Sequence, residues 1–377
     1  MYDCIIVGAG PAGSSAAYHL AKQGCSVLLL EKAALPRYKP CTGAISPSVA
    51  QWFDFDFTPA IARQMRRLRY TWKLEDEITA EFDVSQSPVW VVERSVFDHF
   101  LVKQAIAQGA LLKDDTAATG LRSQPDSWVV STTVGEFQGR YLIAADGAEG
   151  PLSQWLGFKP HKLKTAATFE LKTDVQHPET DAMNFEFGLL KGGCLWGFPR
   201  QEGYTLAAAT FLGKGPEDYR AVLQQYASTF DDSLTQGQIY PHVLKLWDGD
   251  RPLHTQRAVV VGEAAAIVDP LTAEGIRHGM YSGVKAAEAI HAALQGEDAT
   301  LAGYTQAMHE WGSNIQWAQR IAQVFFRVPG IGYRVGIKRP SATTRMGQLL
   351  AGEIQYSDIA NRVIKRMSTG LIGRKSS

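Results

Sequence analysis

One glycine-rich turn constrains the fold of this chain more than any other feature: Gly8-Ala9-Gly10-Pro11-Ala12-Gly13. It follows an apolar run from Cys4 to Val7 and precedes a helical pattern from Ser14 to Lys22. In such a strand–turn–helix unit the first glycine permits the sharp turn, the second lets a diphosphate approach the backbone, and the third allows close helix packing. Pro11 suits the first helical turn, where no amide hydrogen is needed. Because the helix start attracts phosphate, the pattern predicts a dinucleotide site in a Rossmann-type α/β fold.

The end of the next strand supports this prediction. A second apolar run, from Ser26 to Leu30, ends at Glu31, at the distance where such folds place an acid for the ribose hydroxyls. An acid here disfavours an added 2'-phosphate. Lys32 follows it and is included among the candidate cofactor contacts. The alternative is a turn that only connects a strand to a helix, and the turn by itself does not distinguish NAD from FAD.

Composition excludes several classes of protein. With 377 residues and 45% apolar content, the chain can bury a large core and is expected to divide into two structural regions. The formal net charge is zero, so nothing indicates nucleic acid, although the segment 326–377 holds ten Lys or Arg against two acids. The four cysteines form no CxxC pair, which argues against a disulfide framework and a metal site. No apolar run is long enough to span a bilayer.

The start of the chain indicates a compartment. The first strand begins almost at Met1, so removal of a secretory leader would destroy the nucleotide fold. We therefore expect a cytoplasmic protein in a reducing environment, with peripheral attachment to a membrane as an alternative.

Hydrophobic periodicity predicts the remaining elements. A helix is expected from Ser95 to about Gln108, and a long helix from Ile276 to Leu294. Alternation from Thr168 to Phe211 predicts an antiparallel sheet inserted between pieces of the nucleotide fold. Further strands are predicted at 68–82, 89–92, 128–134, 141–145 and 258–261.

Four motifs occur together in a fixed order, and their combination resembles a known family. They are the glycine turn ending at Glu31, Glu93-Arg94 with Phe97-Asp98, Ala145-Asp146-Gly147, and Val261-Gly262-Glu263-Ala264-Ala265 running into Pro270-Leu271-Thr272-Ala273-Glu274-Gly275-Ile276. The chain thereby resembles the flavoprotein superfamily that includes p-hydroxybenzoate hydroxylase and, within it, the geranylgeranyl reductase family. The resemblance covers about residues 2–310, with a family-like tail at 350–367.

The resemblance implies an α/β fold with three regions. A discontinuous Rossmann-type FAD-binding domain is expected at 1–67, 91–165 and 255–310. A substrate domain built on an antiparallel sheet is expected at 68–90 and 166–254. A helical, basic C-terminal region is expected at 311–377.

The same resemblance assigns residues to FAD. Arg94 would reach the phosphate region, although it also fits a solvent-facing charge before a helix, and Ser95 with Asp98 fits a capping box. Asp146 and Gly147 would contact the nucleotide, unless they only form a turn. Glu263, after Gly262, stands where relatives place an Asp for the ribityl chain. The remaining candidates, expected at the flavin ring, are Pro270, Gly275 and Ile276, with Gly275 opening a helix whose positive end can stabilise reduced flavin.

Two further segments resemble the substrate side of the family. In Lys39-Pro40-Cys41 the cysteine is the candidate catalytic proton donor, Lys39 is a candidate substrate contact, and Thr42 stands where glycine is usual. Cys41 also fits an inert small apolar residue. The run Cys194-Leu195-Trp196-Gly197-Phe198-Pro199 resembles a Tyr-x-Trp-x-Phe-Pro signature with Cys194 in place of the tyrosine. It makes Trp196, Phe198 and Pro199 candidates for lining an isoprenoid channel, the alternative being ordinary sheet core.

The function implied is FAD-dependent reduction of isoprenoid carbon–carbon double bonds, most simply in geranylgeranyl diphosphate or a geranylgeranylated lipid or pigment. The alternatives are a flavin monooxygenase or halogenase, and an isoprenoid-binding protein that keeps flavin without catalysis. No second glycine turn supplies an NADPH domain, so NADPH and a partner protein such as ferredoxin both stay open as electron donors.

The basic tail mixes Arg327, Arg334, Lys338 and Arg339 with Phe325, Phe326, Val328, Ile331 and Tyr333. It fits docking on an anionic membrane surface or, alternatively, a solvated helix face.

Overall fold

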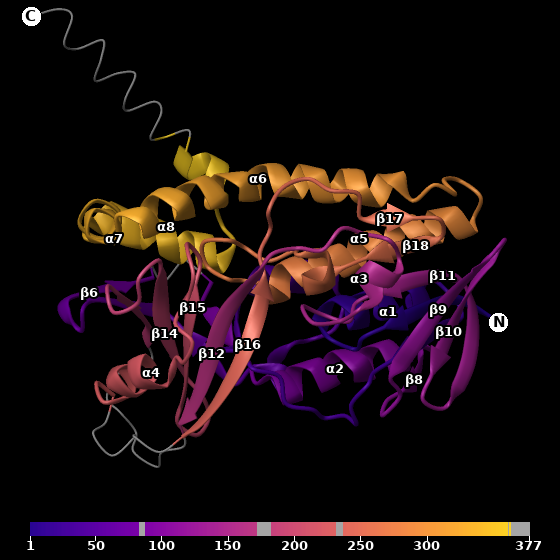
Figure 1. Ribbon diagram of the computed structural model, residues 1–377, viewed down its shortest axis with the longest axis horizontal. Coiled ribbons are helices and arrows are strands. Elements are labelled where there is room, and N and C mark those ends of the chain that lie inside the picture. The colour runs from indigo at the N-terminus through magenta and orange to yellow at the C-terminus, as the bar shows by residue number, and fades with distance from the viewer. Residues whose placement is uncertain (83–86, 172–181, 231–236, 361, 363–377) are drawn as a thin grey trace, which may run out of the picture.

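Two large sheets lie side by side beneath a layer of C-terminal helices, as Figure 1 shows. This computed structural model describes residues 1–82, 87–171, 182–230, 237–360 and 362. The fold is mixed α/β, as predicted, with a nucleotide-binding part, a second sheet and terminal helices.

The first sheet has the predicted parallel centre. Its central strand β1 (Tyr2–Val7) is flanked by β2 (Val27–Leu30) and β11 (Gly135–Ala144), both parallel to it. The strand interiors are buried because helices cover the sheet, which is typical of parallel sheets. The other members are β8 (Leu111–Lys113), β9 (Ala118–Gln124), β10 (Ser127–Thr132), β17 (His254–Thr255) and β18 (Ala258–Val260).

Three helices accompany this sheet: α1 (Pro11–Lys22), α2 (Arg94–Ala107) and α5 (Ile276–Leu294). The predicted bounds of α5 are confirmed, whereas α1 begins at Pro11 rather than at Ser14. Helices α1 and α5 pack so closely that a Cβ at Gly283 would overlap the carbonyl oxygen of Ala12. This contact holds the start of α1 against the interior of α5.

The second sheet confirms the predicted inserted antiparallel sheet, with one parallel pair of strands within it. Its order is β16 (Gln238–Lys245), β12 (Leu163–Leu171), β15 (Tyr204–Thr210), β14 (Gly193–Pro199), β13 (Ala182–Phe187), β5 (Arg67–Trp72) and β6 (Glu75–Glu81). All neighbours are antiparallel except β13 and β5, which are parallel. These two strands are far apart in sequence, so no hairpin turn forces them to run in opposite directions.

Short elements connect the two large sheets. A small third sheet pairs β7 (Val89–Val91) with β3 (Ala44–Ile45) and β4 (Arg63–Met65). The remaining short helices are η1 (Pro47–Trp52), η2 (Thr58–Ala60), α3 (Leu152–Trp155), α4 (Arg220–Ala227) and η3 (Gly262–Ala265).

The C-terminal layer begins with the long helix α6 (Ala302–Arg327), which crosses the predicted boundary at 310/311. It continues through α7 (Pro329–Gly332), one π-helical segment (Tyr333–Ile337) and α8 (Pro340–Ala351). In Figure 1, α6 runs above both sheets. The ends of the predicted family-like tail and of the basic tail, at 361 and 363–377, lie outside the described residues.

The apolar residues of this layer correct one sequence prediction. Phe326 and Tyr333, expected on a surface that faces either a membrane or solvent, are buried in a core cluster. The exposed apolar side chains there are Val324, Val328 and Ile331. Among the helices within the described ranges, none combines the length and apolar character that crossing a membrane requires.

Candidate functional site

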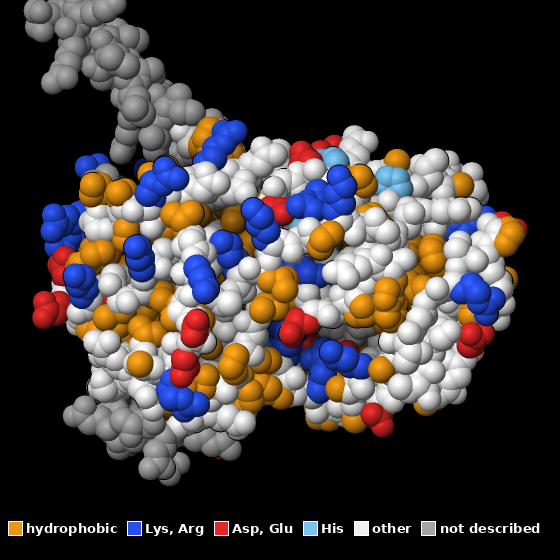
Figure 2. All heavy atoms as spheres, in the orientation of Figure 1, with side chains coloured by type: hydrophobic (Ala, Val, Ile, Leu, Met, Phe, Trp, Pro, Cys, Tyr) orange, Lys and Arg blue, Asp and Glu red, His pale blue; other side chains and the backbone are white. Residues whose placement is uncertain are grey.

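A cavity of about 590 Å³ brings together most of the predicted site residues from both sheets. Figure 2 shows the surface hollowed beside β16, with Lys and Arg side chains at its edge. The predicted residues that line the cavity are Gly8, Gly10, Pro11, Ala12, Glu31, Lys32, Lys39, Cys41, Arg94, Asp146, Gly147, Trp196, Phe198, Gly262, Glu263, Gly275 and Ile276.

Three predicted site residues do not line the cavity, each for a physical reason. Gly13 packs against the turn itself, since a Cβ there would overlap the carbonyl oxygen of Gly8. Pro199 directly follows Phe198 on β14, and successive side chains of a strand point to opposite faces. Pro270 is buried within the turn that Asp269 anchors.

The glycine turn leaves the start of α1 open to the cavity. Gly8 has φ +110°, a conformation that favours glycine, and a Cβ there would overlap the carbonyl oxygen of Ala145. No side chain caps α1. A Cβ at Gly10 would come no closer than 3.8 Å to any other group, that group being Nη2 of Arg37. An uncapped helix start with open space above it is suited to binding an anion.

A chain of buried ion pairs borders this turn. Glu31 accepts a hydrogen bond from the Ala9 amide at 3.0 Å and pairs with Nε of Arg37 at 3.3 Å. Asp98 pairs with Nη1 of Arg37 at 2.9 Å and with Nε of Arg94 at 2.7 Å. The carboxylates of Glu31 and Asp98 thus hold two arginines against the cavity wall.

This geometry overturns the predicted capping box of Ser95 and Asp98. Glu93 is the residue before the first turn of α2, and no side chain forms a capping hydrogen bond there. The carboxylate of Asp98 instead accepts hydrogen bonds from Arg94 and Arg37. The stronger charge-assisted bonds outcompete the backbone amides for this acid. Sequence reasoning also missed Arg37, whose only signal was its place in a loop rich in proline and basic residues.

The segment around Cys41 is fixed from two sides. The Sγ atom of Cys41 accepts a hydrogen bond from the Gly43 amide at 3.3 Å. The hydroxyl of Thr42, which stands in place of the usual glycine, accepts one from Nε1 of Trp196 at 2.8 Å. The departure at Thr42 therefore has a role here: it orients an aromatic side chain of the cavity wall.

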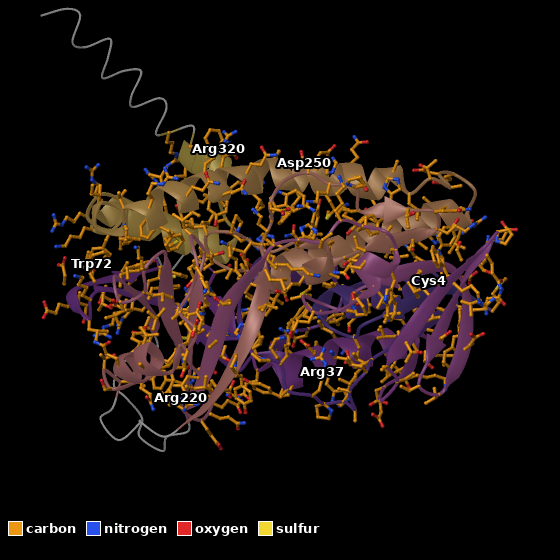
Figure 3. All side chains as sticks on the ribbon, in the orientation of Figure 1. Cys4, Arg37, Trp72, Arg220, Asp250 and Arg320 are labelled. Carbon is orange, nitrogen blue, oxygen red and sulfur yellow. The ribbon has the colours of Figure 1, made fainter. Side chains whose placement is uncertain are left out.

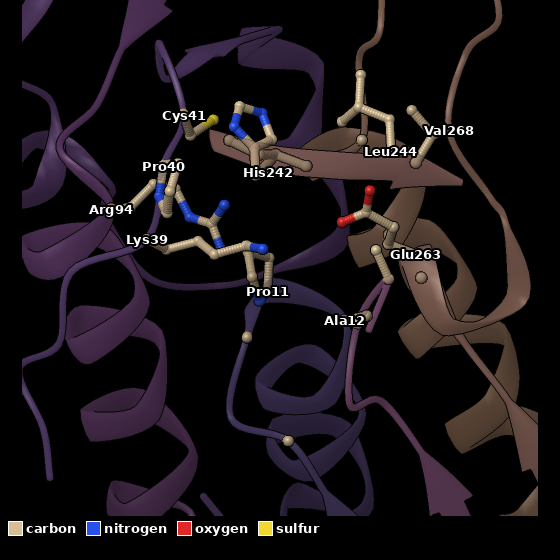
Figure 4. A pocket seen from close by; sticks show the side chains of 18 of the residues that line it. Pro11, Ala12, Lys39, Pro40, Cys41, Arg94, His242, Leu244, Glu263 and Val268 are labelled. Atoms are coloured by element: carbon tan, nitrogen blue, oxygen red, sulfur yellow. The ribbon is translucent and has the colours of Figure 1, made fainter. Parts of the chain in front are cut away.

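His242 is a cavity-lining group that the sequence analysis did not single out. Its Nδ1 lies 3.2 Å from the carbonyl oxygen of Tyr240, which can only accept, so Nδ1 carries the proton and Nε2 is an acceptor. Burial lowers the pKa of His242, which favours the neutral ring. In Figure 4 its ring and the Cys41 thiol point into the same part of the cavity. A lone histidine on a strand gives no signal in the sequence that its side chain lines a cavity.

Two carboxylates face the cavity from the nucleotide-binding part. Asp146 accepts from the Leu152 amide at 2.8 Å through Oδ2, while its buried Oδ1 has no hydrogen-bond partner within the described part of the chain. Glu263 accepts weakly from the Lys245 amide at 3.4 Å, and Figure 4 shows its carboxylate directed into the cavity. Burial raises the pKa of both groups. Oδ1 of Asp146 and the carboxylate of Glu263 are suited to accepting hydrogen bonds from ligand hydroxyls.

The late motif forms a braced turn before α5. Asp269 accepts from the amides of Leu271 and Thr272 through Oδ1 and from the Tyr356 hydroxyl through Oδ2 at 2.6 Å. Gly275 then precedes α5 and lines the cavity. The positive end of a second helix is therefore directed at the site.

Part of the cavity wall is apolar. The apolar residues come from strands of the second sheet, from the segment between η3 and α5, and from α8: Met183, Phe185, Trp196, Phe198, Ala207, Leu244, Val268 and Leu350. A cavity with polar and apolar walls can hold a nucleotide beside a hydrocarbon chain. In the parts of the chain that the structure covers, no group of three or more His, Cys, Asp or Glu is arranged to hold a metal ion.

Comparisons with known proteins agree with this geometry. A family model described as an FAD binding domain matches residues 1–316. The digeranylgeranylglycerophospholipid reductase of Methanocaldococcus jannaschii is 30% identical over 319 residues, covering 79% of this chain and 79% of that protein.

Solved structures share the fold. A geranylgeranyl bacteriochlorophyll reductase-like protein from Thermoplasma acidophilum has a TM-score of 0.75 at 21% identity, covering 93% of this chain and 91% of that one. A flavin-dependent brominase has a TM-score of 0.70 at 19% identity, covering 98% of this chain and 99% of that one. At these identities the structural similarity describes the fold and not the reaction.

Proposed function

Since this chain belongs to the geranylgeranyl reductase family of FAD-dependent oxidoreductases, we propose that it reduces carbon–carbon double bonds of a geranylgeranyl chain carried by a diphosphate, a lipid or a pigment. The observation that supports this most is the joining of a dinucleotide-type polar site to an apolar pocket in one cavity. The name of the Methanocaldococcus jannaschii relative indicates a glycerophospholipid as the carrier of the chain.

The residues of the cavity fit FAD. The open space above Gly10 and the uncapped start of α1 suit a diphosphate, and the spare oxygen of Asp146 suits a hydroxyl. We propose Glu31 and Lys32 for the adenosine side, Arg94, Gly147, Gly262 and Glu263 for the middle of the cofactor, and Gly275 with Ile276 for the ring. When bound and reduced, FAD supplies the hydride for the reaction.

The chain's own residues would prepare the alkene for that hydride. An isolated double bond is unactivated, so addition needs a proton donor and a site that tolerates positive charge on a tertiary carbon. The aromatic faces of Trp196 and Phe198 can stabilise such charge, and the apolar wall excludes water. Cys41 is the proposed proton donor, and Lys39 a proposed contact of the substrate carrier.

A single experiment tests the reaction class. The purified flavoprotein is reduced anaerobically, a candidate geranylgeranyl compound is added, and the product mass is measured. We expect a gain of two hydrogens per double bond and no oxygen. If none of the polyprenyl compounds tried reoxidises the reduced flavin, the proposal is refuted.

The role of Cys41 has its own test. A Cys41→Ala variant is expected to bind FAD but to reduce the alkene at least tenfold more slowly in a single turnover, because general-acid catalysis typically contributes about 10²–10⁴-fold. Undiminished single-turnover reduction would remove Cys41 from the mechanism and leave His242 as the next titratable group of the cavity wall.

A flavin monooxygenase or halogenase is the second candidate, because a brominase shares the fold over nearly the whole chain. The 30% identical reductase favours reduction. Oxygen or halide in the product, formed when the reduced protein meets air, would favour the second candidate. The electron donor is proposed to be NADPH or a ferredoxin-type protein, and anaerobic bleaching of the flavin by each donor distinguishes them.

We also propose that the protein attaches peripherally to an anionic membrane, where long isoprenoid chains partition. The exposed apolar residues of the C-terminal layer lie around the junction of two helices: Val324 in the last turn of α6, Val328 between the helices and Ile331 in α7. Arg320, Arg327, Arg334 and Arg339 are exposed near them in the chain. Figure 2 shows Lys and Arg interspersed with apolar side chains over the corner of the molecule where α7 and α8 lie in Figure 1. This combination is typical of interfacial binding.

A further inference from the structure

Arg37 occupies an unusual position for a residue that only joins a loop to a helix. It lines the cavity, and its side chain is 16% exposed. Two of its three nitrogens are held: Nε pairs with Glu31 at 3.3 Å and Nη1 with Asp98 at 2.9 Å. Both carboxylates are buried, which fixes the plane of the guanidinium. Figure 3 places Arg37 beside α2.

The third nitrogen of Arg37 points to the glycine turn. Its Nη2 lies 3.8 Å from where a Cβ at Gly10 would be, and no other group is as close to that point. Gly10 is the residue at which the backbone allows a diphosphate to approach. The guanidinium of Arg37 therefore lies over the same space as the open start of α1.

We propose that Arg37 binds the diphosphate of FAD through Nη2, with Glu31 and Asp98 holding its guanidinium in place beforehand. This inference rests on the FAD binding of the family and is independent of the reaction proposed above. Because the carboxylates already restrict the side chain, little of its rotamer freedom is lost when the phosphate binds. The diphosphate then lies between a helix start and a fixed arginine.

Arg94 is less well placed for this contact. Its Nε and Nη2 both donate to Asp98, at 2.7 and 2.8 Å, and it also interacts with Cys41. Its remaining donor is thus near the proposed catalytic segment, and no described contact brings it to Gly10. The two arginines share Asp98 but serve different parts of the cavity.

Ligands that carry or lack the diphosphate test the proposal. Affinities for FAD, ADP and riboflavin are measured on the apoprotein of wild type and of Arg37→Gln. We expect the variant to bind FAD and ADP about 10- to 100-fold more weakly, the usual effect of losing a charge-assisted hydrogen bond. Riboflavin affinity is expected to stay within about twofold, since riboflavin has no phosphate. Arg37→Lys should lie between, because lysine keeps the charge but not the fork.

The matched control is Arg122→Gln, which also removes an arginine paired with a glutamate. Arg122 pairs with Glu136 at 3.1 Å, is 57% exposed and does not line the cavity, so all three affinities should be unchanged.

If the affinities of Arg37→Gln for riboflavin and for ADP fell equally, Arg37 would only anchor its loop. Unchanged ADP affinity would also overturn the proposal. If Arg37→Gln does not fold, the ratio of ADP affinity to riboflavin affinity in Arg37→Lys, compared with wild type, decides the question. Wild-type protein that binds no FAD would refute the proposed function as well, whereas the outcomes above leave that function intact.

Discussion

At the scale of single residues, the surroundings of Gly10 and Gly13 separate a ligand contact from a packing contact. A Cβ at Gly13 would overlap the carbonyl oxygen of Gly8, whereas one at Gly10 would meet nothing within 3.8 Å. We expect Gly13→Ala to lower the free energy of unfolding of the apoprotein by about 1–3 kcal/mol, the usual cost of overpacking. Gly10→Ala should leave that free energy nearly unchanged and weaken FAD binding instead.

Urea unfolding of the apoproteins and FAD titration measure the two effects separately. Gly24→Ala serves as a comparison for strain alone, because Gly24 has φ +80° but open space around it. A Gly10→Ala protein that binds FAD as tightly as wild type would show that the ligand does not approach the backbone there.

Residue identities in the cavity were partly predictable for a clear reason. Motif residues such as Glu31 and Asp146 follow buried strands, and strand ends are readable from hydrophobic runs. The partners of Asp98 were not readable, because Arg37 is 61 positions away and only the fold brings it near. His242 was missed because its role depends on which face of β16 meets the cavity, and a strand pattern alone does not say so.

At the scale of elements, a hydrogen bond joins the turn at 269–275 to the C-terminal segment. The hydroxyl of Tyr356 donates to the buried carboxylate of Asp269 at 2.6 Å. In Tyr356→Phe the carboxylate keeps only its two backbone amides. We expect the free energy of unfolding to fall by about 1–3 kcal/mol, the cost of leaving a buried charged group with one bond fewer.

A matched tyrosine provides the control for this prediction. The Tyr226 hydroxyl is buried without a hydrogen-bond partner among the residues described, so Tyr226→Phe should change the free energy of unfolding little. Chemical denaturation of both variants, with and without FAD, measures the difference. Equal losses in the two variants would mean that the bond to Asp269 does not brace the turn.

Helix α5 should make folding sensitive to acid through His278. This ring is buried, its Nδ1 accepts a hydrogen bond from Nε1 of Trp311 at 3.0 Å, and burial holds its pKa well below the ordinary value. The folded state then favours the neutral ring, so stability is complete above about pH 6.5 and is lost as the pH falls below it. Each pH unit below that point costs about 1.4 kcal/mol for this one proton.

Comparison of His278→Gln with wild type isolates that proton. The free energy of unfolding, measured by urea between pH 7 and pH 5, should fall less steeply in the variant. Buried carboxyls away from this ring, such as Glu186, whose pKa is raised by burial, act in the opposite direction in both proteins and cancel in the difference. Glu274 lies 3.6 Å from Nε2 of His278, so its response is part of the measured difference. Identical slopes would show that His278 does not titrate between the two states.

Elements were predictable where their contacts are local. The bounds of α5 follow from its own periodicity and from the glycine before it. The parallel pairing of β13 with β5 joins strands more than 100 positions apart, and nothing in either strand specifies its direction. Short elements such as β3 are set by tertiary pairing, which explains why they carried no pattern.

At the scale of the whole molecule, one apolar cluster extends from the cavity to the C-terminal layer. It contains cavity-lining residues such as Met183 and Phe198, and also Phe326 and Tyr333 beneath the exposed residues of α6 and α7. The sequence could indicate a basic, apolar tail, but not which side chains the core takes up, because that depends on the sheet packed below. The exposed set therefore differs from the predicted one.

This arrangement predicts binding to anionic lipid vesicles. Val324, Val328 and Ile331 are 67%, 43% and 63% exposed, so membrane contact would remove much apolar surface from water. Wild-type protein should sediment with phosphatidylglycerol vesicles and not with purely zwitterionic ones. Val328→Glu with Ile331→Glu should abolish the binding, and Arg327→Gln with Arg334→Gln should weaken it about thirtyfold, at about 1 kcal/mol per charge.

Val134→Glu is the matched control for this surface. Val134 is 61% exposed in the turn between β10 and β11, which lies at the opposite end of the molecule from α7 (Figure 1). Its substitution adds one negative charge, half of what the double variant adds, at an exposure similar to that of Ile331, so vesicle binding should be unchanged. Reduction of a detergent-dispersed geranylgeranyl lipid by the Val328→Glu, Ile331→Glu protein should also persist, because the cavity is intact. Equal loss of vesicle binding in Val134→Glu would show that net charge, rather than this corner, governs attachment, and absence of wild-type binding would exclude it.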